Sequence, residues 1–276
     1  MKRIVTIQDI SCVGKCSLTI ALPIISAMGV EAAILPTAVL STHTMFQNFT
    51  VKDLTDQIEP ISEHWKKENF EFDAVYTGYL GSFEQIDLMK KFFEDFKTES
   101  NILFVDPAMA DNGKLYPAFD EAFAKHMGTL CAKADIIVPN LTEACFMTGM
   151  EYKTEYDEAY VKEVLVRLSE LGAKICILTG VSFAEGKTGV MGYDSATGEF
   201  SYYEHDKLPV SFHGTGDIFS STCVGAMMNG LLWTEAVKVA ADYTAECIRL
   251  TLEDPAKPWY GVNFEQAIPY LVDRIK

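Results

Sequence analysis

The sequence predicts an α/β fold with a mostly parallel central sheet and helices on both faces. Short runs rich in β-branched residues alternate with longer segments of helical period along the whole chain, and this alternation is typical of parallel sheets covered by helices. The chain contains no internal repeat, low-complexity tract or linker-like shift in composition. Its 276 residues are enough for one large α/β domain. We therefore expect a single domain over residues 1–276.

The predicted strands are apolar runs that end at a glycine, a proline or a polar residue. They cover residues 2–7, 30–36, 72–77, 102–105, 135–138 and 174–178. Residues 189–193 and 199–204 predict an antiparallel hairpin around the turn at 195–198. A further strand-like run, residues 208–212, leads into a glycine turn.

The predicted helices are segments in which apolar residues recur with the helical period. They cover residues 17–28, 51–69, 83–97, 116–131, 142–148, 155–171, 234–252 and 264–273. A further helix is expected directly after the glycine turn and contains the small-residue, apolar run 220–228. In residues 83–97 the apolar side chains form one stripe, which indicates a helix packed on the core rather than a cofactor site. Residues 8–15 are expected to form a loop, and residues 37–49 a polar, irregular segment.

The composition excludes several classes of partner. The net charge is −16, which disfavours nucleic acids and anionic membranes as binding partners. No run approaches the roughly 18 apolar residues of a membrane span, and the first residues lead directly into a strand pattern without a cleavage signal. The seven cysteines form no Cys-x-x-Cys pair, as expected for reduced thiols. We expect a cytoplasmic protein with a small-molecule substrate.

The glycine turn at residues 212–219, Phe-His-Gly-Thr-Gly-Asp-Ile-Phe, is the main candidate for chemistry. Gly214 and Gly216 permit a positive φ and a close approach of a ligand to the backbone. The N–H groups of the turn and of the helix that follows favour an anion. Asp217, at the start of that helix, suits a general base beside a phosphoryl group. The alternative is an ordinary helix N-cap.

Polar signatures follow the predicted strands at their carboxyl ends, where ligands bind in parallel sheets. They are Asp9, residues 37–44, Gly78 with Tyr79, Asp106, Asn140, Thr179 with Gly180, and residues 214–217. We expect these loops to converge on one edge of the sheet and to form one shared site.

Three carboxylates in these loops suit Mg²⁺ that is held largely through water and substrate phosphates. They are Asp106, Asp111 and Glu143. The alternative for Asp111 is a solvated loop acid, and for Glu143 a capping-box partner of Asn140. His43 could hydrogen-bond to a polar ring of the ligand. The alternative is a loop residue whose ring is hydrogen-bonded within the protein.

The chain resembles the ribokinase superfamily and, within it, the pyridoxal/pyridoxamine kinases. The resemblance covers nearly the whole chain. It rests on Ile7-Gln8, Ser41-Thr42-His43-Thr44, Thr77-Gly78-Tyr79, Asp106-Pro107 with Asp111, Pro139-Asn140 with Glu143, and Gly214-Thr215-Gly216-Asp217. The glycine-Asp motif marks the superfamily, and the Ser-x-His-Thr segment is the more specific sign of the vitamin B6 kinases.

The resemblance implies a ribokinase-like fold and ATP-dependent phosphorylation of the 5′-hydroxymethyl group of pyridoxal, pyridoxine or pyridoxamine, in a homodimer. It implies that Asp217 is the base and that Gly214, Thr215 and Gly216 form the anion hole. It further implies that Asp106, Asp111 and Glu143 surround Mg–ATP, with Thr179 near the nucleotide phosphates. Thr44, in the segment with His43, and Tyr79 would lie at the substrate ring.

Two positions depart from the family pattern, because Asp9 and Ile10 stand where Ser and His are common. Both border the expected substrate ring, so the identity of the ring is open. Asp9 could bind the ammonium group of pyridoxamine or only hold the loop and the helix that follows. Hydroxymethylpyrimidine kinase is the alternative activity. A nucleotide-binding regulatory module without turnover is the alternative from a different class.

Overall fold

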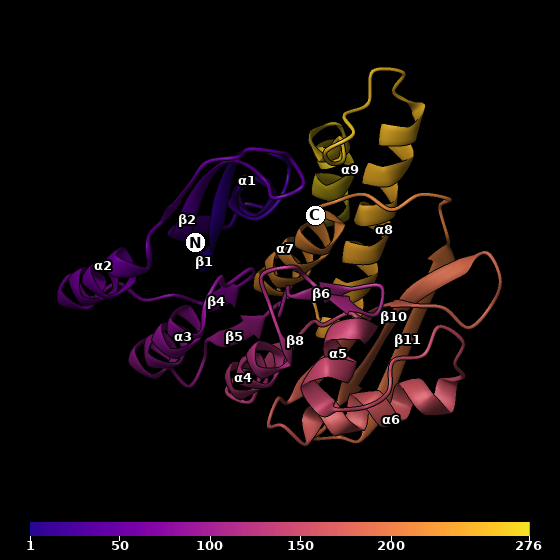
Figure 1. Cartoon of the computed structure of the whole chain (residues 1–276), viewed down its shortest axis with the longest axis horizontal. Helices are drawn as coiled ribbons and strands as arrows, with labels where there is room; N and C mark the ends of the chain where they lie inside the picture. Colours follow the sequence, from indigo (N-terminus) through magenta and orange to yellow (C-terminus); the bar gives the residue numbers. More distant parts are fainter. Residues whose placement is uncertain (276) are drawn as a thin grey trace. The chain divides into compact units, whose positions relative to one another are not determined.

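The computed structural model describes residues 1–275 (Figure 1). The chain divides into two compact units. Unit 1 combines Met1–Tyr76 with Leu208–Lys276, and unit 2 is Thr77–Lys207. The mixed α/β class is confirmed, because parallel strands flanked by helices dominate both units. A single domain over residues 1–276 stays a prediction, and the units are described one at a time.

The strands of unit 1 lie in the order β4-β1-β2-β3. Their bounds are Arg3–Val13 for β1, Glu31–Thr42 for β2, Val51–Asp53 for β3 and Ala74–Thr77 for β4, whose last residue belongs to unit 2. β1 and β2 are parallel, and β3 is antiparallel to β2. The interior of β1 is buried without alternation, as expected for a strand covered on both faces.

The helices of unit 1 are α1 Leu18–Ala27, α2 Thr55–Lys67, α7 Thr215–Met228, α8 Trp233–Glu253 and α9 Phe264–Ile275. α7 packs between α1 and α8, and α9 packs against α8. The side chains of Ile218–Ala226 in α7 are all buried. A Cβ atom on Gly225 would stand 1.9 Å from the Met28 side chain. The small residues therefore let α7 pack deeply, as the sequence predicts.

The main sheet of unit 2 has the order β5-β8-β9-β10-β11. Its strands are Ile102–Val105, Ile136–Ile137, Ile175–Val181, Lys187–Asp194 and Glu199–Asp206, of which the first three are parallel. A small hairpin, β6 Ala110–Asp111 with β7 Lys114–Leu115, follows β5. The helices are α3 Phe83–Phe96, α4 Glu121–Cys131, α5 Leu141–Thr148 and α6 Glu158–Ser169.

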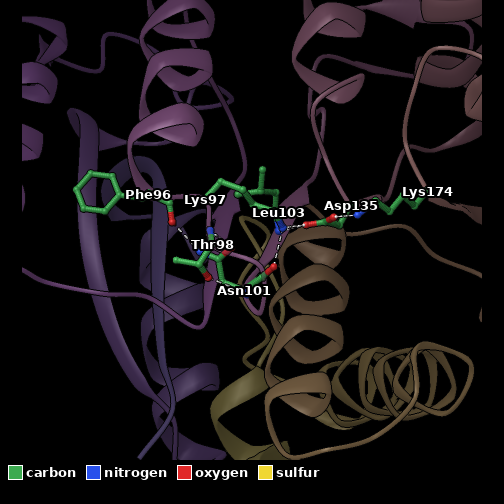
Figure 2. A network of polar contacts seen from close by, with 7 residues as sticks. All are labelled: Phe96, Lys97, Thr98, Asn101, Leu103, Asp135 and Lys174. Atoms are coloured by element: carbon green, nitrogen blue, oxygen red, sulfur yellow. Dashed lines mark hydrogen bonds and ion pairs between the residues drawn. The ribbon is translucent and has the colours of Figure 1, made fainter.

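A polar network ties together the starts of the parallel strands of unit 2 (Figure 2). The Asp135 carboxylate accepts hydrogen bonds from the Leu103 N–H and from the ammonium groups of Lys97 and Lys174. Burial opposes ionisation of Asp135, but these three donors outweigh it and hold its pKa below the usual value. The network lies at the amino ends of β5, β8 and β9, away from their carboxyl ends.

Several predicted boundaries are wrong. Residues 8–15 are not a loop, because β1 continues to Val13. β2 likewise continues through residues 37–42, and residues 51–53 form β3 instead of helix. Residues 208–212 form no strand. Pro209 lacks a backbone donor, and residues 209–211 are exposed to solvent, so their apolar content does not contribute to a sheet.

No helix within residues 1–275 is long and apolar enough to cross a lipid bilayer.

Candidate functional site

Gly214 forms the turn that starts α7. Its φ is 84° and it occupies the N-cap position, a left-handed conformation that favours glycine. A Cβ atom at this position would stand 2.2 Å from the carbonyl oxygen of Lys15, so both the conformation and the packing require glycine. Gly216 lies in the first helical turn instead, without a positive φ, and a Cβ atom there would meet open space.

The first turn of α7 presents an open backbone surface and a carboxylate. The first N–H groups of a helix have no partner within the helix, and the helix dipole favours negative charge at this end. The Thr215 hydroxyl donates to the Phe212 carbonyl and thereby closes the turn. Asp217 is the third residue of α7, whereas the N-cap is Gly214. Asp217 is therefore not the N-cap, and the alternative interpretation of it is wrong.

The Asp217 carboxylate is fixed by a residue far away in the sequence. Its Oδ2 accepts a hydrogen bond of 2.9 Å from the backbone N–H of Ser17. Ser17 directly precedes α1 and has φ 51° and ψ −132°. Its hydroxyl donates to Oδ1 of Asp9 at 2.6 Å. Unit 1 therefore connects Asp9, Ser17 and Asp217 in one chain of hydrogen bonds.

Asp9 lies inside β1 and is only 5% exposed. Its second oxygen, Oδ2, accepts from the Ser11 hydroxyl at 3.1 Å. Burial raises the pKa of Asp9 above the usual value, although the two hydroxyl donors and His43 oppose this. These contacts support the alternative that Asp9 holds the local structure over the prediction that it binds a substrate amine.

His43 is buried, and its ring is held at both nitrogens. The Met45 N–H donates to Nδ1 at 3.2 Å, and Nε2 lies 3.0 Å from the Tyr260 carbonyl oxygen. The ring also lies 4.5 Å from that of His213, between ring centroids. Burial and the neighbouring His43 lower the pKa of His213 to about 4. Thr44, in contrast, is exposed to solvent.

In unit 2, Asp106 directly follows β5 and lies beside Glu143. Both side chains are buried. Burial and the charge of Asp106 raise the pKa of Glu143 well above the usual value, against the three backbone donors that bind it. Two buried carboxylates that repel each other fit a site for a cation.

Glu143 also forms a capping box with Asn140 at the start of α5, which is the alternative role that the sequence predicts for it. Its Oε2 accepts from the Asn140 N–H, and the Asn140 side chain accepts from the Glu143 N–H. Its Oε1 accepts from the N–H groups of Met109 and Ala110. The same carboxylate thus holds the start of α5 and the segment that follows β5.

Asp111 is not grouped with this pair in the structure. Its side chain is exposed, and its two oxygens accept hydrogen bonds from the backbone and the side chain of Asn112. Within residues 1–275, no three His, Cys, Asp or Glu side chains are grouped so that they could hold a metal ion. A cation at Asp106 and Glu143 would therefore need ligands from water or from a bound phosphate.

The remaining predicted residues of unit 2 lie near the carboxyl ends of the strands. The Thr179 N–H donates to the Pro139 carbonyl, and Thr179 is paired with Asn140. The Asp106 N–H donates to the Thr77 carbonyl, so Asp106, Asn140 and Thr179 share one edge. Tyr79 is half-buried, with its ring 5.6 Å from that of Phe119 between centroids.

Sequence reasoning missed the segment Lys15–Ser17. The Lys15 carbonyl packs on Gly214, its ammonium group pairs with Glu265 at 2.6 Å, and Ser17 binds Asp217. A serine directly before a helical pattern is a signal for a helix start. Its contact with an aspartate 200 residues away in sequence leaves no local signal.

Comparisons with known proteins show which family the chain belongs to. The phosphomethylpyrimidine kinase family matches residues 22–258. A pyridoxal kinase from Dictyostelium discoideum is 24% identical over 239 residues, which cover 81% of this chain and 77% of that protein.

Solved structures extend the similarity to almost the full length of the chain. The crystal structure of a proposed phosphomethylpyrimidine kinase from Bacteroides thetaiotaomicron, in a form with pyridoxal, is 37% identical with a TM-score of 0.93, and covers 98% of this chain and 95% of that chain. The crystal structure of the pyridoxal kinase from Lactobacillus plantarum is 28% identical to this chain with a TM-score of 0.91. The match covers 99% of this chain and 97% of that chain. The predicted resemblance to pyridoxal kinases of the ribokinase superfamily is thereby confirmed, and the chain belongs to the phosphomethylpyrimidine kinase family.

Proposed function

We propose that this chain transfers the γ-phosphoryl group of ATP to the 5′-hydroxymethyl group of pyridoxal, pyridoxine or pyridoxamine. The observation that carries the proposal is the start of α7, where Asp217 lies in the first helical turn behind the left-handed Gly214. A carboxylate beside free helix N–H groups suits the removal of a proton from an alcohol while a phosphoryl group is bound nearby. The similarity to pyridoxal kinases supports the substrate class.

The residues of unit 1 would act directly on the reacting groups. Asp217 accepts the proton of the substrate alcohol. The backbone of Gly214, Thr215 and Gly216 stabilises the charge of the transferring phosphoryl group. The open space at Gly216 leaves room for that group beside the helix. His43 and Thr44 remain the proposed contacts of the substrate ring in this unit. Tyr79, which belongs to unit 2, is a proposed ring contact on its sequence motif alone.

The residues of unit 2 would hold the nucleotide and its metal ion. Mg²⁺ fits Asp106 and Glu143, because a cation relieves the repulsion between these two buried carboxylates. When bound, the ion neutralises charge on the nucleotide phosphates. Thr179 is proposed to lie near those phosphates. Asp111 keeps its solvated position in this proposal.

An ATP-consumption assay tests the function. Purified protein receives Mg–ATP with each of the three B6 vitamers and, separately, with hydroxymethylpyrimidine. We expect turnover with at least one vitamer, a phosphorylated product detected by mass spectrometry, and a higher kcat/KM than with the pyrimidine. An Asp217→Asn sample serves as the control for contaminating kinases. Turnover with the pyrimidine alone would assign the alternative activity.

A regulatory module that binds ATP without turnover is the second alternative. It would bind nucleotide in calorimetry but consume none with any of the four alcohols. The presence of the Asp217 carboxylate argues against a regulatory module, because a protein that only binds nucleotide has no need of a base next to an anion site.

We also propose a homodimer in the cytoplasm, as the resemblance implies. Light scattering coupled to gel filtration would test the oligomeric state, with a mass of about twice 30.7 kDa as the expected result.

A further inference from the structure

The segment Lys15–Ser17 adopts a backbone conformation that its residues rarely adopt. Lys15 has a φ of 50° and Ser17 a φ of 51°, although neither is glycine. Two such residues within three positions indicate a segment that its surroundings hold in place, and such segments cluster at functional sites. The contacts of the segment show what this conformation achieves.

The segment touches both parts of the proposed phosphoryl-transfer site in unit 1. The Lys15 carbonyl packs on Gly214, the residue that forms the turn. The Ser17 N–H points at Asp217 and donates to its Oδ2 at 2.9 Å. The unusual backbone angles of Ser17 thus aim an N–H group at the carboxylate.

Asp9 fixes Ser17 in this conformation. The Ser17 hydroxyl donates to Asp9 Oδ1 at 2.6 Å, and the Ser17 carbonyl accepts from Ile20 and Ala21 in the first turn of α1. Asp9 itself is 5% exposed and lies where the register of β1 against β2 shifts, between Gln8 and Ile10. Irregularities of this kind redirect side chains near active sites.

Two other titratable groups face this chain of contacts. The Cys16 thiol lies beside Asp9 and Asp217, and burial together with the charge of Asp217 raises its pKa far above the usual value. Cys16 is therefore a neutral thiol at all ordinary pH values. The charge of His43 acts to lower the pKa of the Asp9 carboxyl.

We propose that Ser17, held by the buried Asp9, is the positioning residue for Asp217. The Ser17 N–H fixes the orientation of the carboxylate and favours its ionised form, since a hydrogen bond to the charged form lowers the proton affinity. Asp217 then meets the substrate alcohol already ionised and aligned. This inference rests on the proposed function, and it assigns to Asp9 a role in positioning rather than in substrate recognition.

The principal test is Ser17→Gly. Glycine accepts the backbone angles of residue 17 without strain, so the variant keeps the fold, but it loses the hydroxyl that Asp9 holds. We expect kcat to fall roughly 10- to 100-fold, the effect of a misplaced reacting group, while the KM for ATP stays within about threefold. The acid limb of kcat/KM against pH should move to higher pH. Asp9→Ala should act in the same direction, and Asp9→Asn should recover most of what Asp9→Ala loses.

Ser11→Ala is the matched control. Ser11 donates to the same Asp9 carboxylate, whereas the hydrogen bond to Asp217 comes from the backbone of Ser17. We expect kcat within about twofold of the parent protein and an unchanged pH profile. An equal loss in Ser11→Ala and Ser17→Gly would assign a purely structural role to Asp9 and overturn the proposal.

A measurement without turnover separates this proposal from the proposed function. The pKa of the Asp217 carboxyl group is measured from the ¹³C chemical shift of its carboxyl carbon as a function of pH. The Asp217→Asn variant is used to assign the signal. A higher pKa in Ser17→Gly than in the parent protein supports the positioning role even if no B6 vitamer is phosphorylated. An unchanged pKa overturns it even if the kinase activity is present. Thermal unfolding of each variant confirms that the folded protein is measured.

Discussion

Asp217 and Gly214 lie where the sequence predicts them, at the start of a helix. The carboxylate lies in the first turn of α7, and Gly214 has the positive φ that the motif predicts. We expect Asp217→Asn to lower kcat about 10²- to 10⁴-fold, the usual effect of losing a general base. The KM for ATP should stay within a few-fold, because the amide keeps the size of the side chain. Steady-state kinetics would check this, and near-normal turnover would remove Asp217 from the mechanism.

His213 makes the stability of the protein depend on pH. Burial and His43 lower its pKa from 6.5 to about 4, so the unfolded chain takes up this proton at a higher pH than the folded protein does. The free energy of unfolding therefore falls as pH decreases from about 6.5 to 4, by about 3 kcal/mol from this group. Below pH 4 this contribution changes no further.

The His213→Gln variant tests that pH dependence. Urea unfolding between pH 4 and pH 7 should show a smaller loss of stability toward acid than in the parent protein, since glutamine does not titrate. His64→Gln is the control, because the His64 side chain is 67% exposed and should leave the slope unchanged. Identical slopes for His213→Gln and the parent protein would contradict the prediction.

Some site residues could be predicted from the sequence and others could not, for a physical reason. Gly214, Asp217, Asp106 and Glu143 stand in local motifs whose neighbours define their conformation. Ser17 acquires its role only through contact with Asp217, which lies 200 residues away in sequence. The role of Asp9 is open at the level of sequence, because its contacts with the buried Ser11 and Ser17 form only in the fold.

At the scale of elements, the sequence predicts buried strands and amphipathic helices better than polar strand ends. β5 and α3 occur almost where predicted, because apolar residues fill them. β1 and β2 extend beyond their predicted ends because Asp9, Ser11 and Thr37 are buried polar residues inside strands. Residues 208–212 are the opposite case, an apolar run that is largely exposed.

The network around Asp135 predicts a change in stability without a change in catalysis. Asp135→Asn removes the charge that Lys97 and Lys174 pair with at the amino ends of β5, β8 and β9 (Figure 2). We expect a loss of about 2 kcal/mol in the free energy of unfolding, the usual contribution of a hydrogen bond to a charged group. Because the carboxyl ends of the strands are untouched, kcat should stay within about twofold.

Urea unfolding and steady-state kinetics would check this pair of outcomes. The lowered pKa of Asp135 means that its stabilisation is present above pH 4 and is lost as pH falls further, so the difference between variant and parent should vanish in acid. Glu94→Gln is the control. The ion pair of Glu94 with Lys133 is exposed, so its loss should lower the free energy of unfolding by less than about 1 kcal/mol.

At the scale of the whole molecule, the net charge of −16 works against the binding of ATP. An anionic nucleotide approaches an anionic protein, so under the proposed function its binding would depend on the local N–H groups of α7 and on the metal ion. Salt weakens the repulsion, because the Debye length falls from about 30 Å at 0.01 M to about 8 Å at 0.15 M ionic strength. We expect kcat/KM for Mg–ATP to rise several-fold over this range at saturating pyridoxal.

The same titration with pyridoxal as the varied substrate is the internal control. Pyridoxal carries little net charge near neutral pH, so its kcat/KM at saturating ATP should change less than twofold. A fall of kcat/KM for Mg–ATP with salt would mean that local positive potential at the site dominates the field of the whole protein. In that case the helix N-terminus and the metal ion attract the nucleotide over a longer range than the surface acids repel it.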